Sequence, residues 1–408
     1  MLEAILERCA GLDVHQETVV ACVLTGPLDR APKLEMRTFG TMTHELMELG
    51  EWLVNEGCTH VAMESTGIYW KSVWNVLEAF DLDLLLANAH HVKNLPGRKT
   101  DMKDAEWIAK LLRCGLIEGS FVPTEDIRDL RDLTRYRKKL VHDATSEKNR
   151  IHKSLQDANI KLTTHMSASG RLLLQKIVDG EVITMEFLET HMRGALKHKS
   201  PKLLQSLNGR LRKHHRDMIR FSWNHLMYLE QQIEQVEQDI RGRLANKQEA
   251  MDLLTSIPGI NEQAASIIVA EIGTDMSAFK DDHHLAAWAG VTPGNHQSAG
   301  KKRTRARSGN NHLKAVLSEC AWAASMTRNT RLSARYWNWV KRLGKKKALV
   351  ALGHTLLRIV YHMLATKTPY KELGADYLEH FRQEREKRRE AEVIRQLEAK
   401  GFTVSRPA

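Results

Sequence analysis

The N-terminal part of the sequence alternates short extended patterns with helical ones, in an order that few folds accommodate. The extended patterns include a hairpin, and the first helix has Thr43 as its expected cap. Strands are predicted at residues 9–14, 19–24, 33–39, 59–65 and 82–87, and helices at 43–55 and 67–80. Three strands followed by a helix, a strand, a helix, a strand and a further helix predict a mixed α/β domain with helices on the faces of one sheet.

This order of elements is that of a ribonuclease-H-like sheet, and four acidic residues stand at its strand and helix ends. Asp13 lies in the first strand and Glu64 ends a later one, while Asp101 and Asp104 are spaced to share one helix face. Carboxylates placed together repel each other unless a cation lies between them, and their hard oxygens suit Mg²⁺ or Mn²⁺. Four could hold two metals that clamp the oxygens of a phosphodiester. The alternative is that they are ordinary strand-end and helix N-terminal acids.

The chain is strongly basic, with a formal net charge of +11 over 408 residues. This length suffices for two or three domains, and the excess of Lys and Arg indicates a polyanionic partner, most often nucleic acid. The cations are concentrated in a long helical pattern over residues 125–162, for which a solvated face is the alternative. Nucleic-acid contacts are expected from Arg135, Arg137, Lys138 and Lys139, and from Arg98 and Lys99 in the loop before the acidic pair.

Cysteine usage and hydropathy indicate the compartment. The five cysteines are scattered without a CxxC pair, which argues against a disulfide framework or a zinc–thiolate site and fits a reducing cytosol. No run is expected to span a membrane, and the N-terminus lacks the basic-then-apolar order of a signal peptide. We therefore expect a cytoplasmic protein with no membrane partner.

A second long helix is predicted over residues 214–244. Its apolar residues repeat at alternating steps of three and four, which is the pattern of a coiled coil. They are Leu226, Leu229, Ile233, Val236 and Ile240. The stripe is short, so packing within the subunit and association between subunits both remain open.

Two motifs in the C-terminal half suggest contacts with phosphate. The turn at Pro258 and Gly259 could offer backbone N–H groups to a phosphate as helix-hairpin-helix modules do, or could be an ordinary turn between helices. Ser298 is expected in a loop of small residues. It is followed by the cations Lys301, Lys302 and Arg303. A serine hydroxyl becomes a nucleophile when its proton is removed and developing charge is neutralised. The alternative is a serine that only binds phosphate.

Taken together, these motifs resemble those of a known family. They are Gly11-Leu12-Asp13-Val14-His15, Met63-Glu64-Ser65-Thr66-Gly67, Lys99-Thr100-Asp101-Met102-Lys103-Asp104, Ile257-Pro258-Gly259 and Gln297-Ser298-Ala299-Gly300-Lys301. Up to about Tyr377, the chain is similar to the IS one-ten insertion-sequence transposases, which are also described as bridge-RNA-guided DNA recombinases.

The resemblance implies an architecture and a set of partners. It implies a RuvC-like metal domain over residues 1–124, a basic helical and coiled-coil linker over 125–248, a mostly α C-terminal transposase domain over 249–377 and a charged tail over 378–408. It implies a tetramer that recognises donor and target DNA through a structured non-coding RNA, in the bacterial cytoplasm and on the nucleoid.

The resemblance also implies a mechanism. Ser298 would attack DNA and form a covalent phosphoserine, assisted by the Asp13, Glu64, Asp101 and Asp104 site of a partner subunit. Two other functions remain open: a metal-dependent junction nuclease, like Holliday-junction resolvases, in which water attacks, and a non-enzymatic RNA-chaperone-like binder. A covalent protein–DNA adduct separates the first function from the other two.

Overall fold

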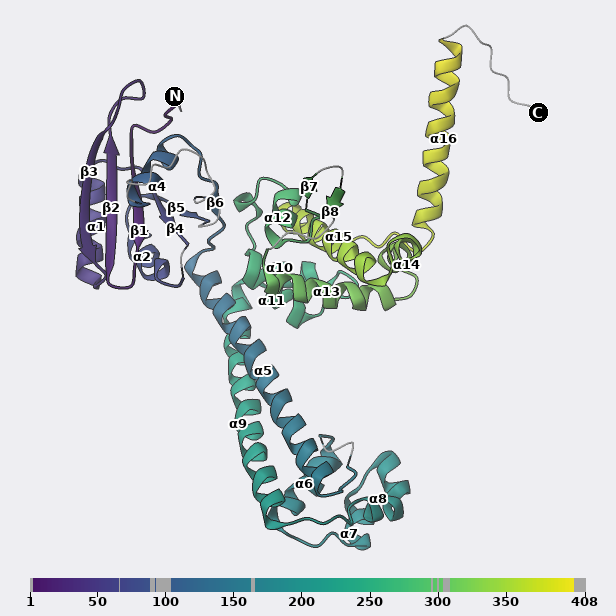
Figure 1. Cartoon of the computed structure of the whole chain (residues 1–408). Coiled ribbons are helices and arrows are strands. Elements are labelled where there is room, and N and C mark those ends of the chain that lie inside the picture. The colour runs from purple at the N-terminus through teal and green to yellow at the C-terminus, as the bar shows by residue number, and fades with distance from the viewer. Residues whose placement is uncertain are drawn as a thin grey trace. The chain divides into compact units, whose positions relative to one another are not determined.

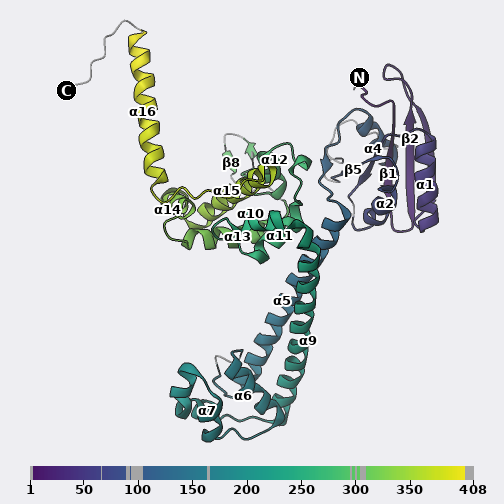
Figure 2. The same cartoon turned by 180° about the vertical axis from the view of Figure 1, so that it is seen from behind.

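The chain folds into two units, which divide between Val122 and Pro123. The computed structural model describes residues 3–65, 67–88, 92, 104–162, 166–294, 296–298, 301–303 and 309–399, shown in Figures 1 and 2. For residues 296–298 and 301–303 the description is of the backbone alone.

The N-terminal unit is built on a six-stranded mixed sheet with the strand order β3-β2-β1-β4-β5-β6 (Figure 1). Its strands are β1 (Arg8–Val14), β2 (Thr18–Thr25), β3 (Lys33–Gly40), β4 (His60–Glu64), β5 (Asp83–Ala87) and β6 (Gly119–Ser120). Strand β2 pairs antiparallel with both β1 and β3, strands β1, β4 and β5 are parallel, and β6 returns antiparallel to β5. The predicted mixed α/β sheet is confirmed.

Helices cover both faces of this sheet because its strands are apolar on both sides. Helices α1 (Thr43–Asn55) and α2 (Trp70–Leu77) pack on the face that carries Leu12 and Met63. Helix α4 (Asp104–Arg113) packs on the opposite face, over Cys9 and Ala62. Helix α2, at Trp70–Leu77, is shorter at both ends than the helix expected over residues 67–80.

Thr43 is not the cap of α1, as the sequence suggested. The residue before it, Met42, holds the cap position, and its backbone N–H donates to Glu45 Oε2 at 3.0 Å. A carboxylate in the first turn satisfies an orphan N–H as a capping side chain would, and it also interacts favourably with the helix dipole.

The second unit begins with two long antiparallel helices, α5 (Glu125–Asp157) and α9 (Lys213–Leu244), which pack along each other (Figure 1). Shorter helices at the far end lie between them in the chain. They are α6 (Ala168–Asp179), α7 (Met185–His191), the 3₁₀ helix η1 (Gly194–Lys199) and α8 (Ser200–Ser206). Leu226, Leu229, Val236 and Ile240 of the predicted stripe on α9 are buried, and Ile233 is half-buried. The stripe therefore packs within the chain.

The remainder of this unit is a helical bundle with a small hairpin. The helices are α10 (Gln248–Thr255), α11 (Glu262–Ile272), α12 (Asp282–Ala289), α13 (Asn311–Met326), α14 (Arg331–Leu343), α15 (Lys345–Thr366) and α16 (Tyr377–Glu398), with 3₁₀ helices η2 (Ala245–Lys247) and η3 (Met276–Ala278). Strands β7 (His296–Ser298) and β8 (Lys301–Arg303) pair antiparallel. The mostly helical remainder is confirmed, although α12 and α14 were not predicted.

Helix α15 corrects the expectation that no run is apolar enough for a membrane. By length and composition this helix could cross one, but half of its apolar window is buried inside the protein. It packs against α10, α12, α13 and α14. The same apolar composition is required of a helix that forms the centre of a bundle, and this packing accounts for it.

Candidate functional site: a carboxylate edge and a serine hairpin

Strand register places two of the predicted acids side by side. Leu12 of β1 pairs with Met63 of β4 in parallel register, and Asp13 and Glu64 are the next residues of these strands. Successive side chains along a strand alternate between the faces of the sheet. Since Leu12 and Met63 both lie in the α1–α2 core, Asp13 and Glu64 both face the side covered by α4.

The third acid reaches the same edge because α4 packs closely on the sheet at Gly11. A Cβ atom added at Gly11 would lie 2.3 Å from Ala109 N and 2.4 Å from Ala105 O. No side chain could be accommodated there without moving the helix backbone. Asp104 opens α4, one residue before Ala105. Glycine at position 11 thus lets the helix bring its first residue toward Asp13.

The electrostatics of Asp13 show that the three carboxylates are close enough to interact. Burial raises the pKa of Asp13 above its ordinary value, and the negative charges of Asp104 and Glu64 raise it further. The imidazole of His15 opposes the shift, with Nε2 lying 3.2 Å from Asp13 Oδ2. A cation placed among these carboxylates would relieve both their repulsion and their desolvation.

The chemistry of these donors fits a hard divalent cation, which prefers carboxylate oxygens. Among the described residues, no three His, Cys, Asp or Glu side chains converge as a ready-made metal site. The fourth predicted ligand, Asp101, lies outside the described residues, as do Arg98 and Lys99. Asp13, Glu64 and Asp104 are therefore the predicted ligands that lie within the described residues, and they do not by themselves form a complete metal site.

A hydrogen bond links the two loops that follow the acidic strands. Tyr69 Oη donates to Gln16 Oε1 at 3.2 Å, and Thr41 Oγ1 donates to the Gln16 carbonyl at 2.9 Å. Gln16 lies in the turn after Asp13, and Tyr69 lies in the segment after Glu64. This contact was not predicted from the sequence, because it joins residues far apart in the chain whose spacing follows no helical or strand period.

Ser298 lies at the end of a β-strand and not in an irregular loop as expected. It closes β7 and pairs with Lys301 of β8, so only two residues separate the strands. The cations Lys301, Lys302 and Arg303 form the second strand. The hairpin gives Ser298 a defined backbone position beside a basic strand, and it belongs to a different unit from the carboxylates.

The structure divides the basic residues of α5 into two groups. Arg135 makes two hydrogen bonds to the buried Glu271, at 2.9 and 2.8 Å, and Arg137 Nε lies 2.8 Å from Glu237 Oε1. Lys138 and Lys139 are exposed. Because carboxylates already hold both arginines, the lysines are the better candidates for phosphate contacts.

The predicted phosphate turn at Gly259 packs into the bundle. A Cβ at Gly259 would lie 2.5 Å from Ala324 N and 2.6 Å from Cys320 O, and Ile257 and Ile260 are buried. Its φ of +93° also favours glycine. These contacts explain the residue by close packing against α13, so the ordinary inter-helix turn is the interpretation that the structure favours.

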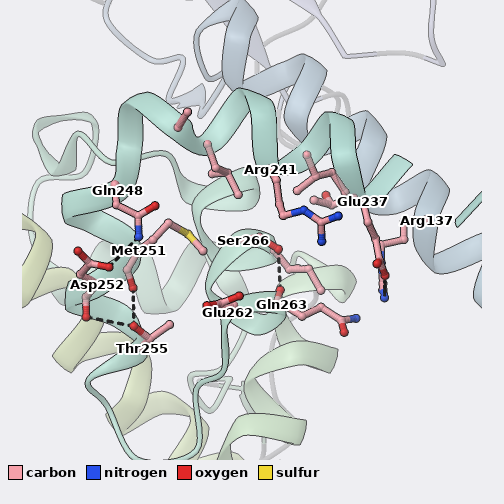
Figure 3. Close-up of a pocket in the computed structure, with 15 residues that line it drawn as sticks. Arg137, Glu237, Arg241, Gln248, Met251, Asp252, Thr255, Glu262, Gln263 and Ser266 are labelled. Carbon is pink, nitrogen blue, oxygen red and sulfur yellow. Dashed lines mark hydrogen bonds and ion pairs between the residues drawn. The ribbon is translucent and has the colours of Figure 1, made fainter. Parts of the chain in front are cut away.

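The second unit has a pocket of about 520 Å³ where α9, α10 and α11 meet α5 (Figure 3). Its charged lining consists of two guanidinium groups and three carboxylates, from Arg137, Arg241, Glu237, Asp252 and Glu262. The acids outnumber the bases, so the pocket lacks the electropositive lining that a polyanion requires. We assign no nucleic-acid contact to it.

The sequence analysis missed Glu271, which is fully buried near the end of α11. It is the one charged residue in the run from Ala264 to Ile272, whose other members are apolar apart from Ser266. A single acid within such a helical run was a signal of a buried ion pair. The sequence did not identify its partners.

Comparisons with known proteins cover both units. A family model described as the DEDD transposase of IS110 matches residues 10–160, and a model described as "Transposase IS116/IS110/IS902 family" matches residues 251–337. Together they cover more than half of the chain. The first spans all four predicted acids and the second spans Ser298.

Individual relatives are similar over most of their length. The transposase for insertion sequence element IS1328 of Yersinia enterocolitica is 26% identical over 64% of this chain and 71% of its own. A probable family 20 transposase of Pseudomonas aeruginosa is 25% identical over 76% and 85%. A pilin gene-inverting protein of Moraxella bovis is 24% identical over 88% and 96%.

Proposed function

Because the chain belongs to the IS110 family of insertion-sequence transposases, enzymes that act on DNA, we propose that it cleaves and rejoins DNA through a covalent phosphoserine at Ser298. In the first step, Ser298 Oγ forms a bond to the phosphorus of a scissile phosphodiester. The bond from phosphorus to one deoxyribose oxygen breaks, that oxygen leaves with a proton, and the serine proton passes to a base. In the second step, the hydroxyl of another strand end attacks the phosphoserine and releases Ser298.

The observation that carries this proposal is the placement of Asp13 and Glu64 on adjacent strands, with Asp104 brought toward them by α4. We propose that these three residues, with Asp101, hold Mg²⁺, for which Mn²⁺ could substitute. A divalent cation bound there would neutralise charge that develops on the phosphate oxygens. The basic strand that follows Ser298 would contribute further positive charge.

The remaining parts of the proposal rest on the family resemblance and on charge. We propose that donor and target DNA are selected by a structured guide RNA and that the protein acts as a tetramer in the bacterial cytoplasm, with the carboxylates of one subunit serving the serine of another. The net charge of +11 supports polyanionic partners. We also propose the division into a RuvC-like domain, a helical linker, a serine domain and a tail.

The test is a denaturing gel of labelled DNA incubated with the protein, its co-purified RNA and Mg²⁺. The wild-type protein is expected to give a protein-linked DNA band, and Ser298→Ala is expected to give none while still binding DNA. Asp13→Asn is expected to lose the band because metal binding fails. Mixing the two inactive variants is expected to restore part of the band if the site is shared between subunits.

The same gel identifies the competing reaction. Mg²⁺-dependent cleavage by wild-type protein without any protein-linked band would assign the attack to water, as in a structure-specific junction nuclease. A protein-linked band that persists in Ser298→Ala would assign the attack to another nucleophile. Either result would overturn the proposed role of Ser298.

A further inference from the structure

The segment that carries Ser298 leaves the helical bundle and returns to it at one point. Gly290 ends α12 with φ of +71°, and Gly309 directly precedes Asn310 at the start of α13. The backbones of the two glycines are in contact, since a Cβ added at Gly309 would lie 2.5 Å from Gly290 N. We call Gly290, Gly309 and Asn310 the neck. Contacts that hold the neck in place therefore also hold the base of the segment that contains the β7–β8 hairpin.

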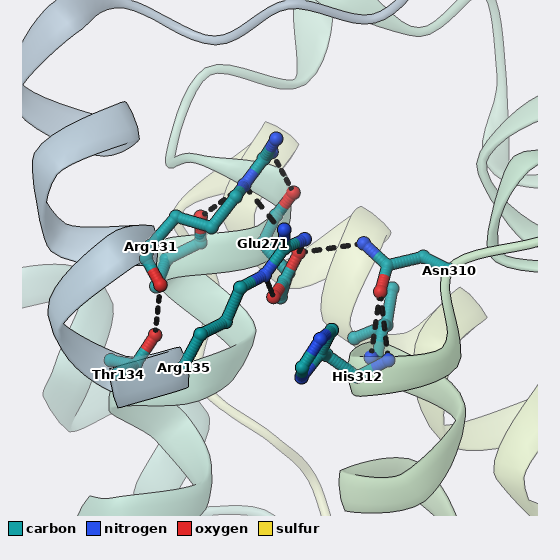
Figure 4. Close-up of polar contacts among 8 residues, drawn as sticks. Arg131, Thr134, Arg135, Glu271, Asn310 and His312 are labelled. Atoms are coloured by element: carbon teal, nitrogen blue, oxygen red, sulfur yellow. Dashed lines mark hydrogen bonds and ion pairs between the residues drawn. The ribbon is translucent and has the colours of Figure 1, made fainter. Parts of the chain in front are cut away.

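The side chain of Asn310 makes two separate sets of hydrogen bonds at the neck (Figure 4). Its side-chain carbonyl caps α13 by accepting from the backbone N–H groups of His312 and Leu313, at 3.0 and 3.1 Å. Its side-chain NH₂ group donates to Glu271 Oε2 at 2.6 Å. The cap needs only the carbonyl oxygen, so the bond to Glu271 is an additional connection between the neck and α11.

Glu271 connects the neck to α5. Arg135 donates to both of its carboxylate oxygens, and Arg131 Nη2 donates to its backbone carbonyl at 2.7 Å (Figure 4). Burial opposes ionisation of Glu271, but the hydrogen bonds from Arg135 and Asn310 outweigh it and keep its pKa below the ordinary value. The buried, ionised carboxylate is therefore bonded to α5 on one side and to the neck on the other.

We infer that Glu271 and Arg135 are positioning residues for Ser298, which they orient through Asn310 at the neck. This inference rests on the proposed role of Ser298. The geometry supports it because the three elements meet at a single carboxylate: α5 through Arg135, α11 through Glu271 itself and the neck through Asn310. Rotation of the neck would have to break a charge-assisted hydrogen bond to a fully buried carboxylate.

Asn310→Asp breaks this connection while retaining the cap. Aspartate caps helices as well as asparagine does, but it offers no donor to Glu271 and places a second carboxylate beside it. The double variant Glu271→Gln with Asn310→Asp reverses the hydrogen bond. The introduced amide then donates to the introduced carboxylate and its oxygen accepts from Arg135 Nε, while Arg135 Nη2 loses its acceptor at position 271. Asn261→Asp is the matched control, because Asn261 caps α11 through Ala264 N and lies away from the neck.

The first measurement is the rate at which the protein-linked DNA forms in a single turnover, starting from a preformed complex of protein and DNA. Asn310→Asp is expected to slow it by roughly ten- to a hundredfold, which is the scale of misplacing a reacting group by about 1 Å. Its affinity for DNA is expected to match that of Asn261→Asp, while its melting temperature falls below that of this control because a second carboxylate lies beside the buried Glu271. The double variant is expected to recover part of the lost rate, which a merely damaged fold would not do.

The second measurement does not depend on catalysis. Hydrogen exchange of the full-length protein is expected to accelerate in residues 291–303 of Asn310→Asp and to remain unchanged in α5 and α11. If wild-type protein gives no Ser298-dependent band, the proposed function fails, and the exchange result alone decides whether the neck is held by Glu271. If the band forms and Asn310→Asp makes it at the control rate, or if the double variant recovers nothing, the inference is wrong.

Discussion

Asp13 and Glu64 occupy matching positions on adjacent parallel strands, one residue beyond the paired Leu12 and Met63. Their proximity is therefore set by the hydrogen-bonded register of the sheet and not by the conformation of a loop. A pair of acids held in this way remains together whether or not a cation is bound, and its repulsion is relieved when one binds.

Mg²⁺ is expected to stabilise the wild-type protein and not Asp13→Asn. A ligand that binds only the folded state adds about 2.7 kcal/mol to the free energy of unfolding at a concentration about 100 times its Kd. Thermal melts over a Mg²⁺ series measure this effect. Glu51→Gln is the control, because Glu51 is an exposed acid on α1. An equal Mg²⁺ response in Asp13→Asn would exclude the residue as a ligand.

Gly11→Ala is expected to destabilise the N-terminal unit and to weaken Mg²⁺ binding. The added methyl group meets the backbone of α4, which must move away and take Asp104 with it. Overpacking of this kind costs typically about 1–3 kcal/mol. Chemical denaturation and Mg²⁺ titration would measure the two effects. Gly242→Ala, in an open position of α9, should instead be neutral or stabilising. Unchanged Mg²⁺ affinity in Gly11→Ala would show that α4 does not set the site.

Charge reversal at Lys138 and Lys139 is expected to weaken nucleic-acid binding. Each lost phosphate contact should lower the slope of log affinity against log salt by about one unit. Arg137→Ala is expected to change stability instead, because its side chain is paired with Glu237. Filter binding over a salt series, with melting curves for each variant, separates the two groups. An unchanged slope in the lysine variant would remove α5 from the nucleic-acid interface.

Leu229→Ala is expected to unfold the α5–α9 pair and not simply to reduce the mass in solution. Leu229 is 4% exposed, and truncating a buried leucine costs about 2–5 kcal/mol. Tyr228→Ala is the control, because that neighbouring side chain is 57% exposed. Circular dichroism and sedimentation would be measured together. A smaller assembly with an unchanged melting temperature would assign Leu229 to a contact between subunits.

Acid is expected to destabilise the second unit partly through Glu271. Its pKa is lowered in the folded protein, so its contribution is complete above the ordinary glutamate pKa and is lost as the pH falls through the lowered value. The free energy of unfolding of Glu271→Gln should be below that of wild type near neutral pH. The difference should shrink below about pH 4, near the ordinary pKa of glutamate. A difference independent of pH would show that the charge of Glu271 does not contribute.

The sequence by itself determined the order and type of most elements. Two largely apolar runs, at residues 9–14 and 19–24, around a turn at 15–18 predicted β1 and β2, and the apolar period of residues 43–55 predicted α1, because local side-chain spacing follows directly from strand and helix geometry. The same local reasoning placed Asp13 and Glu64 in strands of one sheet. It failed at Ser298, which was expected in a loop and instead ends the short strand β7.

Only the tertiary structure decided which partner each charged group has. The periodicity of α5 shows that Arg135 and Lys138 lie on a helix, but not that Arg135 is held by Glu271, 136 residues further on. The periodicity of residues 214–244 likewise predicts the apolar stripe of α9, but not whether α5 or another subunit covers it. The physical reason is that backbone geometry sets local spacing, whereas ion pairs and close backbone approaches such as Gly11 on α4 depend on which surfaces meet when the chain folds.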